Sequence, residues 1–215
     1  MSARNAGATK NMTNYDPAIH HRRSIRLKGY DYSRAGLYFV TICCQYRICR
    51  FGKIANGEVV LNDAGKMVDK WCLELSSKFA DIAMDTYIIM PNHFHAIIVN
   101  TGFNTVGADL RVCPHCVCPH CVCPRVDDDV WGEHANHRGE HVGSPLHAVV
   151  QWFKTMTTNE YIRGVKTLGW QPFDKKLWQR NYWEHIIRND QSYHQIADYI
   201  ITNPVHWQND QLYIE

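Results

Sequence analysis

Two patterns of hydrophobic and polar positions alternate along the chain, one typical of strands and the other of helices. Aromatic and β-branched side chains dominate residues 36–46 and predict a first, largely buried strand. Asn56-Gly57 is the strongest short-range signal for a β-hairpin. Apolar residues then recur at three- and four-residue spacing behind a cap at Asn62 or Asp63, which predicts a helix.

The middle of the chain predicts two further strands. Residues 86–90 and 94–100 are rich in Ile, Val, Tyr and Phe, which fit pleated, buried surfaces. Pro91 and Asn92 interrupt the ladder between them, so we expect a strand, a short break and a second strand.

The last part of the chain predicts two helices around an extended segment. Ser144 and Pro145 suit the first positions of a helix with one apolar face. Residues 177–188 predict a shorter strand or an extended segment, and residues 189–204 predict a last helix that ends at Pro204.

This order of elements predicts the fold class. Strand, helix, two strands, helix, strand and a terminal helix indicate an α+β fold, a ferredoxin-like antiparallel sheet with helices on one face. The other face of the sheet would then be free for a ligand.

The composition bounds the domain organisation and the class of protein. With 215 residues, 45% of them hydrophobic, the chain can bury the core of one domain. We expect that domain over residues 21–210, with an insertion at about 101–143, a flexible N-terminus (1–20) and a tail (211–215).

No apolar stretch of about 18 residues or signal peptide is present, so we expect a cytoplasmic protein without a membrane partner. The nine cysteines are an odd number, and those outside the insertion resemble reduced core cysteines.

Two histidines stand one residue apart in an apolar run. On a strand, His93 and His95 project from the same face and lie close enough to share one ligand. Burying both without a shared partner is costly, and neutral imidazole is a common ligand of divalent ions. The pair therefore indicates a metal site; the alternative is two core histidines with separate hydrogen-bond partners.

The last helix offers the missing groups. Tyr199 and Asn203 are four residues apart, hence on one helix face. The amide oxygen of Asn203 could complete a two-histidine metal site, and Tyr199 could act as a nucleophile beside it. A divalent cation would reduce the cost of ionising the phenol, about 4 kcal/mol at neutral pH. The alternative is that Tyr199 is an ordinary tyrosine of an amphipathic helix.

Three blocks of the sequence resemble the single-tyrosine HUH transposases, especially the group related to REP-associated tyrosine transposases. The blocks are HRRSIRLKGYDYSRAGLYFVTIC (21–43), MPNHFHAIIV (90–99) and LWQRNYWEHIIRNDQSYHQIADYIITNPVHW (177–207). The resemblance covers nearly all of residues 21–210 except the insertion.

The resemblance implies a ferredoxin-like HUH endonuclease that recognises hairpin-forming single-stranded DNA. Such an enzyme cleaves with a tyrosine, leaves a 5′-phosphotyrosine link and a free 3′-hydroxyl, and then rejoins the strand. His93 and His95 match its metal-binding pair, Tyr199 its nucleophile and Asn203 its third, variable ligand, with Mg²⁺ or Mn²⁺ as the expected ion. A homodimer is one arrangement that the sequence leaves open.

Basic and aromatic side chains offer contacts to such a DNA. The net charge of +2 is too mild to identify a nucleic-acid partner by itself. Trp178, Tyr182 and Trp183 either stack on unpaired bases or pack in the core. The candidate backbone contacts are Arg22, Arg23, Arg26, Lys28, Arg180 and Arg188.

The insertion contains a tandem repeat with two Cys-Pro-His-Cys units, at residues 113–116 and 118–121. Each unit has chelating spacing, but only Val117 separates them, far less than the span of about 12 or more residues in ordinary zinc sites. A structural zinc, adventitious metal capture and an inert insertion are the alternatives, and the tight repetition favours the last. We therefore expect the insertion to be dispensable for cleavage.

The main hypothesis is a DNA strand-transferase of the tyrosine HUH type. Two alternatives remain at this point. One is a domesticated hairpin-DNA binding protein without transposition, and the other is a metal-dependent hydrolase that uses activated water.

Overall fold

The computed structural model describes residues 26–27, 29–102, 111–112, 122–123 and 143–214. The two Cys-Pro-His-Cys units lie outside these residues. Two short strands of the insertion, β6 (Arg111–Val112) and β7 (Val122–Cys123), pair antiparallel. Within the described ranges, no helix combines the length and the apolar character needed to cross a membrane.

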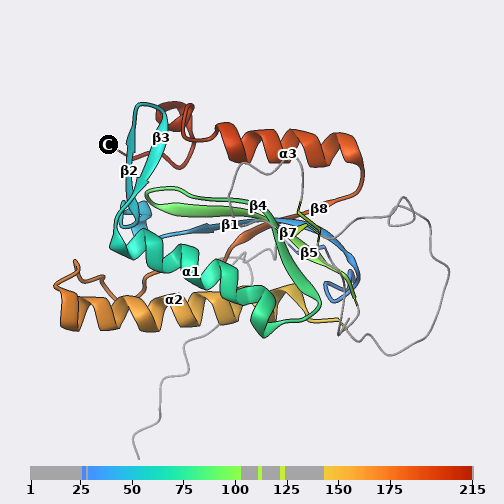
Figure 1. Cartoon of the computed structure of the whole chain (residues 1–215), viewed down its shortest axis with the longest axis horizontal. Coiled ribbons are helices and arrows are strands. Elements are labelled where there is room, and N and C mark those ends of the chain that lie inside the picture. Colours follow the sequence, from blue (N-terminus) through green and yellow to red (C-terminus); the bar gives the residue numbers. More distant parts are fainter. Residues whose placement is uncertain (1–25, 28, 103–110, 113–121, 124–142, 215) are drawn as a thin grey trace, which may run out of the picture.

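The centre of the molecule is a sheet of β1 (Gly36–Cys43), β4 (Ile82–Ile89), β5 (His93–Asn100) and β8 (Trp183–Ile187) (Figure 1). The strand order is β4-β5-β1-β8, and all neighbouring strands are antiparallel. This arrangement confirms the predicted ferredoxin-like fold class.

Helices α1 (Asp63–Lys78) and α2 (Leu146–Leu168) cover one face of the sheet (Figure 1). The Asn62 side chain caps α1 by accepting a hydrogen bond from the Gly65 amide at 2.9 Å. The cap of α2 is Pro145, one residue later than the sequence predicts. The reason is a tertiary contact, because the Ser144 hydroxyl donates to the Asp81 carboxylate instead of capping the helix.

Helix α3 (Asp190–Thr202) lies on the opposite face of the sheet (Figure 1). Alternate residues of β1 explain this: Tyr38 packs in the core with α1 and α2, whereas Leu37 and Phe39 pack with Ala197 and Ile200 of α3. The expectation that this face is free for a ligand is therefore wrong where α3 lies, because the apolar stripe of the helix has to be buried. Both faces of β1 and β5 are covered, and almost every residue of these two strands is buried.

Local signals also placed the hairpin correctly. Strands β2 (Gly52–Ala55) and β3 (Glu58–Leu61) are joined by Asn56-Gly57, both at positive φ (54° and 75°), as a type I′ turn requires. The first strand ends at Cys43, earlier than predicted, because the chain turns into a 3₁₀ segment (Gln45–Arg47).

Cys43, Cys44, Cys49 and Cys72 are free, as expected. Cys44 and Cys72 are buried, and burial raises the pKa of both thiols well above the usual value. Both are therefore protonated core residues. Cys43 is partly buried and Cys49 is exposed.

Candidate metal and tyrosine site

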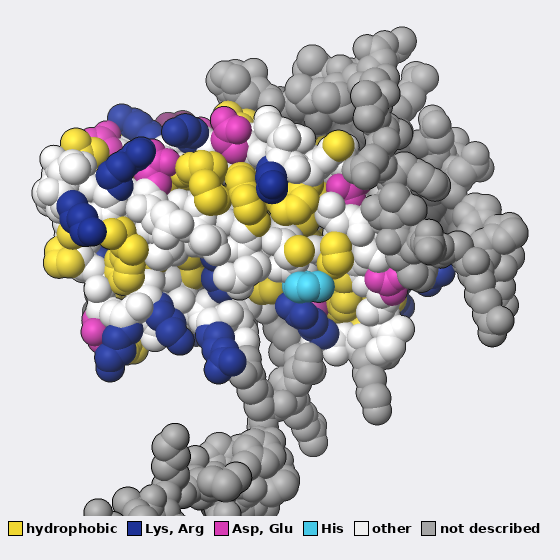
Figure 2. Space-filling view, turned by 90° about the horizontal axis from the view of Figure 1, so that it is seen from below, with side chains coloured by type: hydrophobic (Ala, Val, Ile, Leu, Met, Phe, Trp, Pro, Cys, Tyr) yellow, Lys and Arg dark blue, Asp and Glu magenta, His cyan; other side chains and the backbone are white. Residues whose placement is uncertain are grey.

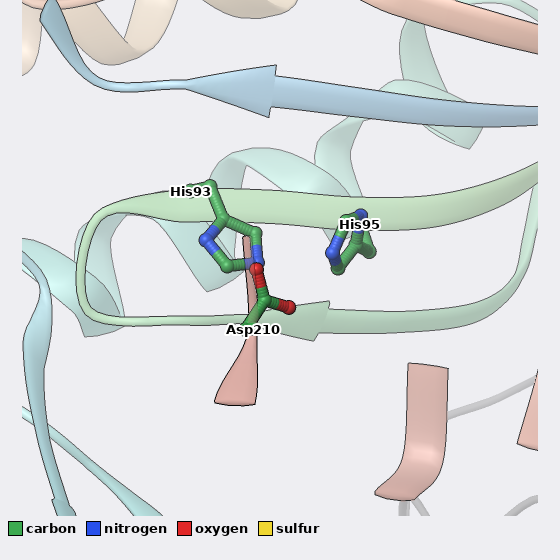
Figure 3. Close-up of side chains that lie close together, drawn as sticks. All are labelled: His93, His95 and Asp210. Carbon is green, nitrogen blue, oxygen red and sulfur yellow. The ribbon is translucent and has the colours of Figure 1, made fainter. Parts of the chain in front are cut away.

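The two histidines begin β5 and point to the same side of the strand (Figure 3). Both rings are buried, and their centroids are 4.4 Å apart. The period of two along a strand produces this proximity without help from other elements. The predicted pairing of His93 and His95 is thus present in the fold.

A hydrogen-bond network orients the His93 ring. Asn92 Nδ2 donates to the carbonyl oxygens of Arg47 (2.9 Å) and Leu212 (2.8 Å). Because both amide protons are used, Asn92 Oδ1 is the acceptor for His93 Nδ1 at 2.7 Å. His93 therefore carries its proton on Nδ1 and keeps the Nε2 lone pair for a ligand. Such outer partners of ligating histidines set the tautomer and the ring orientation.

Thr41 orients the ring of the second histidine, His95. Its hydroxyl lies 2.8 Å from His95 Nδ1, so His95 Nε2 also points away from the strand. Thr41 is the register partner of His95 in β1. The tertiary pairing of the two strands thus supplies a contact that the histidine motif alone does not reveal.

Asp210 completes a group of three potential metal ligands. Nitrogen atoms of His93 and His95 and a carboxylate oxygen of Asp210 lie within 4.8 Å of one another (Figure 3). The Leu212 amide donates to Asp210 Oδ1 at 2.5 Å, and Asn203 Nδ2 donates to Oδ2 at 2.8 Å. Asp210 is not predicted from the sequence, because it follows a short 3₁₀ segment (Trp207–Asn209) with no periodic signal.

Asn203, the predicted third ligand, lies beside Asp210 at the C-terminal cap of α3. The residue is 2% exposed, and its Oδ1 is buried without a hydrogen-bond partner among the described residues. An unsatisfied buried oxygen is costly unless an ion or water fills its place. Asn203 therefore stays a predicted ligand, and Asp210 is an additional oxygen ligand to consider.

The protonation of the histidines suits metal binding. Burial, with a smaller contribution from the Arg47 guanidinium, lowers the pKa of His93 to about 3. Burial and the neighbouring His93 ring lower the pKa of His95 well below the usual value. Both rings are therefore neutral at pH 7, the form that binds metals. His93 Nε2 is buried without a hydrogen-bond partner among the described groups, so an ion at this point would satisfy it.

Tyr199 reaches the same point from α3. Its hydroxyl lies 3.3 Å from His95 Nε2 and 3.3 Å from Asp210 Oδ2, and the residue is 43% exposed. Burial and the adjacent Asp210 carboxylate raise the pKa of Tyr199 to about 12, so the phenol is protonated at neutral pH. The arrangement joins a candidate nucleophile, a potential proton acceptor and a candidate metal site.

His95, Tyr199 and Asp210 line a cleft of about 800 Å³. Tyr182 and Trp183 line it together with Tyr199 and His95. Trp178 does not, because it is buried in the core with its indole donating to Thr157 Oγ1 at 2.9 Å. Of the two alternatives for Trp178, base stacking is therefore wrong and core packing is right.

The predicted basic contacts are not all gathered at the cleft. Arg22, Arg23 and Lys28 lie outside the described residues. Arg180 is exposed in the segment before β8, whereas Arg188 is exposed beyond the far end of that strand, away from the histidines.

Arg26 is exposed and lies next to the aromatic side of the cleft. Its guanidinium donates to Tyr182 Oη at 3.1 Å and lies 3.7 Å from a Glu184 carboxylate oxygen. On the α1 and α2 side of the molecule, Lys and Arg are interspersed with acidic and apolar groups (Figure 2). That face therefore does not form a uniform basic patch.

Comparison with known proteins identifies a relative. An uncharacterised protein of Haemophilus influenzae (strain ATCC 51907 / DSM 11121 / KW20 / Rd) is 36% identical over 203 residues, covering 94% of this chain and 99% of that protein. The chain belongs to the same family as that protein. No protein-family model matches the chain.

Two solved structures are similar to a lesser degree. A REP-associated tyrosine transposase bound to a REP hairpin is 19% identical, with a TM-score of 0.49, over 85% of this chain and 73% of that one. A candidate transposase of Deinococcus radiodurans is 12% identical, with a TM-score of 0.39, over 82% of this chain and 96% of that one.

Proposed function

We propose that this protein is a metal-dependent tyrosine transposase of the HUH type, which cleaves and rejoins hairpin-bearing single-stranded DNA. The observation that carries the proposal is that the Tyr199 hydroxyl lies 3.3 Å from both His95 Nε2 and the Asp210 carboxylate. An ordinary tyrosine of an amphipathic helix needs neither contact. Three separate elements, β5, α3 and the C-terminal segment, bring these groups together.

The chain holds a ligand set that suits Mg²⁺ or Mn²⁺. His93, His95 and Asp210 would hold the ion, with Asn203 as the further candidate. When bound, the ion polarises the phosphodiester and lowers the pKa of a nearby phenol. The neutral state of both histidines and the unpartnered His93 Nε2 support this role.

Tyr199 is the nucleophile in this proposal. Its Oη attacks the phosphorus while the bond from phosphorus to the 3′ oxygen breaks, which yields a 5′-phosphotyrosine and a free 3′-hydroxyl. The phenolic proton passes to Asp210, which the hydroxyl contacts, and the departing 3′ oxygen takes up a proton from solvent water. A 3′-hydroxyl can later attack the phosphotyrosine and rejoin a strand, because the energy of the broken ester is retained.

The substrate class comes from the resemblance of the three sequence blocks to tyrosine HUH transposases. The exposed Arg180 side chain is a candidate phosphate contact, and Arg26, which contacts Tyr182 and Glu184, lies next to the cleft. Tyr199 contacts His95 of its own chain. We therefore expect cleavage to require no residue of a second copy.

A covalent adduct tests the proposal. The full chain is incubated with Mg²⁺ or Mn²⁺ and a pool of hairpin oligonucleotides with randomised single-stranded flanks. Since the protein keeps the 5′ phosphate, a 3′-end label should move with the protein on a denaturing gel, and a 5′-end label should be released. Tyr199→Phe should abolish the adduct while metal binding is retained, and Tyr46→Phe, which changes an exposed tyrosine outside the cleft, should not.

Other outcomes identify the alternatives. Cleavage without an adduct would mean that water attacks and that the protein is a metal-dependent hydrolase. Hairpin binding without cleavage would indicate a DNA-binding protein without transposition. Either result would overturn the strand-transfer proposal.

A further inference from the structure

Trp183 lies on the same side of the sheet as the tyrosine and histidine groups. It is the first residue of the edge strand β8 and faces Thr41 of β1, which in turn faces His95 of β5. It also lines the cleft that contains Tyr199. Two strand spacings, about 10 Å, therefore separate its backbone from that of His95.

Neighbouring rings hold the Trp183 indole in place. The indole and the buried Phe39 ring form a T-shaped pair, with a centroid distance of 5.5 Å and an interplanar angle of 74°. The His185 imidazole lies parallel to it, at 6.1 Å and 6°. Both are favourable aromatic arrangements, yet the residue remains 48% exposed. The indole is thus a supported aromatic surface that keeps a large part of its area open to solvent.

The chemistry around the indole indicates the kind of ligand. Amide side chains of Gln179, Asn181 and Asn209 line the same cleft, and no lysine or arginine is among its described lining residues. A site built for phosphate alone would need a cation. An aromatic face beside amide groups suits a flat, neutral ring with polar edges, which describes a nucleobase.

We propose that Trp183, supported by His185 and Phe39, is a stacking site for one unpaired base next to the cleaved phosphate. This inference rests on the proposed function and adds to it the contact that holds the strand beside Tyr199. Paired bases within a duplex already stack on their neighbours, so only a single-stranded base can occupy the site. Given the distance to His95, we expect the base within about one or two nucleotides of the phosphate.

Fluorescence of a base analogue tests this site without cleavage. The Tyr199→Phe chain is mixed with hairpin oligonucleotides whose single-stranded thymidine flank carries 2-aminopurine at one position at a time. We expect strong quenching at one flank position. Trp183→Ala should remove the quenching and weaken binding about tenfold, and Trp183→Tyr should retain most of both. Tyr46→Ala, which removes another exposed aromatic ring outside the cleft, should change neither.

A change in the DNA makes the test independent of the folding of the variant. An abasic nucleotide at the quenched position should weaken binding by the Trp183-containing chain about tenfold. If the strand binds but no flank position shows Trp183-dependent quenching, the stacking site is refuted even if the covalent adduct forms. If quenching depends on Trp183 but no adduct forms, the stacking site stands and the strand-transfer proposal fails. If no strand binds, both are overturned.

Discussion

Asn92 joins the two segments that form the candidate metal site, and we expect its replacement by alanine to weaken both the fold and metal binding. The residue is 1% exposed. It accepts a hydrogen bond from His93 Nδ1 and donates to the carbonyl oxygens of Arg47 and Leu212. The Leu212 amide in turn holds Asp210.

The magnitude follows from these three buried hydrogen bonds. Each contributes about 1 kcal/mol net, so Asn92→Ala should lower the free energy of unfolding by about 3 kcal/mol. For a chain of this size that corresponds to a decrease in Tm of about 6–12 °C. Loss of an outer partner of a ligating histidine should also weaken Mn²⁺ binding by about 10- to 100-fold.

Thermal unfolding of the metal-free protein and Mn²⁺ titration by electron paramagnetic resonance check the two effects separately. Asn189→Ala is the matched control, because it removes an asparagine cap of α3 away from the site and should cost about 1 kcal/mol without changing metal affinity. Asn92→Asp can still accept from His93, so it should lose less affinity than Asn92→Ala. A folded Asn92→Ala variant that binds Mn²⁺ as tightly as the unmodified chain would refute the role of Asn92.

Three further predictions concern the second histidine, pH and the insertion. Thr41→Val removes the 2.8 Å contact to His95 Nδ1 and should weaken Mn²⁺ binding about tenfold, whereas Thr41→Ser should restore it; equal affinities would contradict this. Because burial lowers the pKa of His93 to about 3, the unfolded chain binds a proton at this residue more readily than the folded chain does. The contribution of His93 to the free energy of unfolding is therefore fully present above pH 6.5 and is lost as the pH falls toward 3. In urea titrations with chelator, His93 should contribute a fall in the free energy of unfolding of up to about 1.4 kcal/mol per pH unit over that range, and His93→Gln should reduce the total slope by that contribution; coincident slopes would show that the folded ring is not held neutral. Replacing residues 103–142 by a short Gly-Ser linker should preserve nicking, because the two ends of the insertion are adjacent. A Cβ atom placed on Gly143 would lie 3.3 Å from Gly102 Cα. Loss of all nicking in a folded deletion variant would contradict this prediction.

Local chemistry made much of the fold predictable from the sequence. The hairpin at Asn56-Gly57 and the cap at Asn62 follow from preferences of neighbouring residues. The shared face of His93 and His95 follows from the period of a strand, which needs no knowledge of the rest of the chain. The order of elements then restricts the topology to a few arrangements, of which the ferredoxin-like sheet is one.

Contacts between distant segments were decided only by the tertiary structure. Asp210 has no local signal, and it becomes a candidate ligand because the segment after α3 folds back onto the start of β5. The same packing gives Asn92 a role in orienting His93, although the sequence shows it only as a break between strands. A periodic pattern identifies which residues share a face of one element, but the three-dimensional packing decides which elements meet. The sequence therefore determined the histidine pair and the helix that carries Tyr199, and the fold determined that they meet at Asp210.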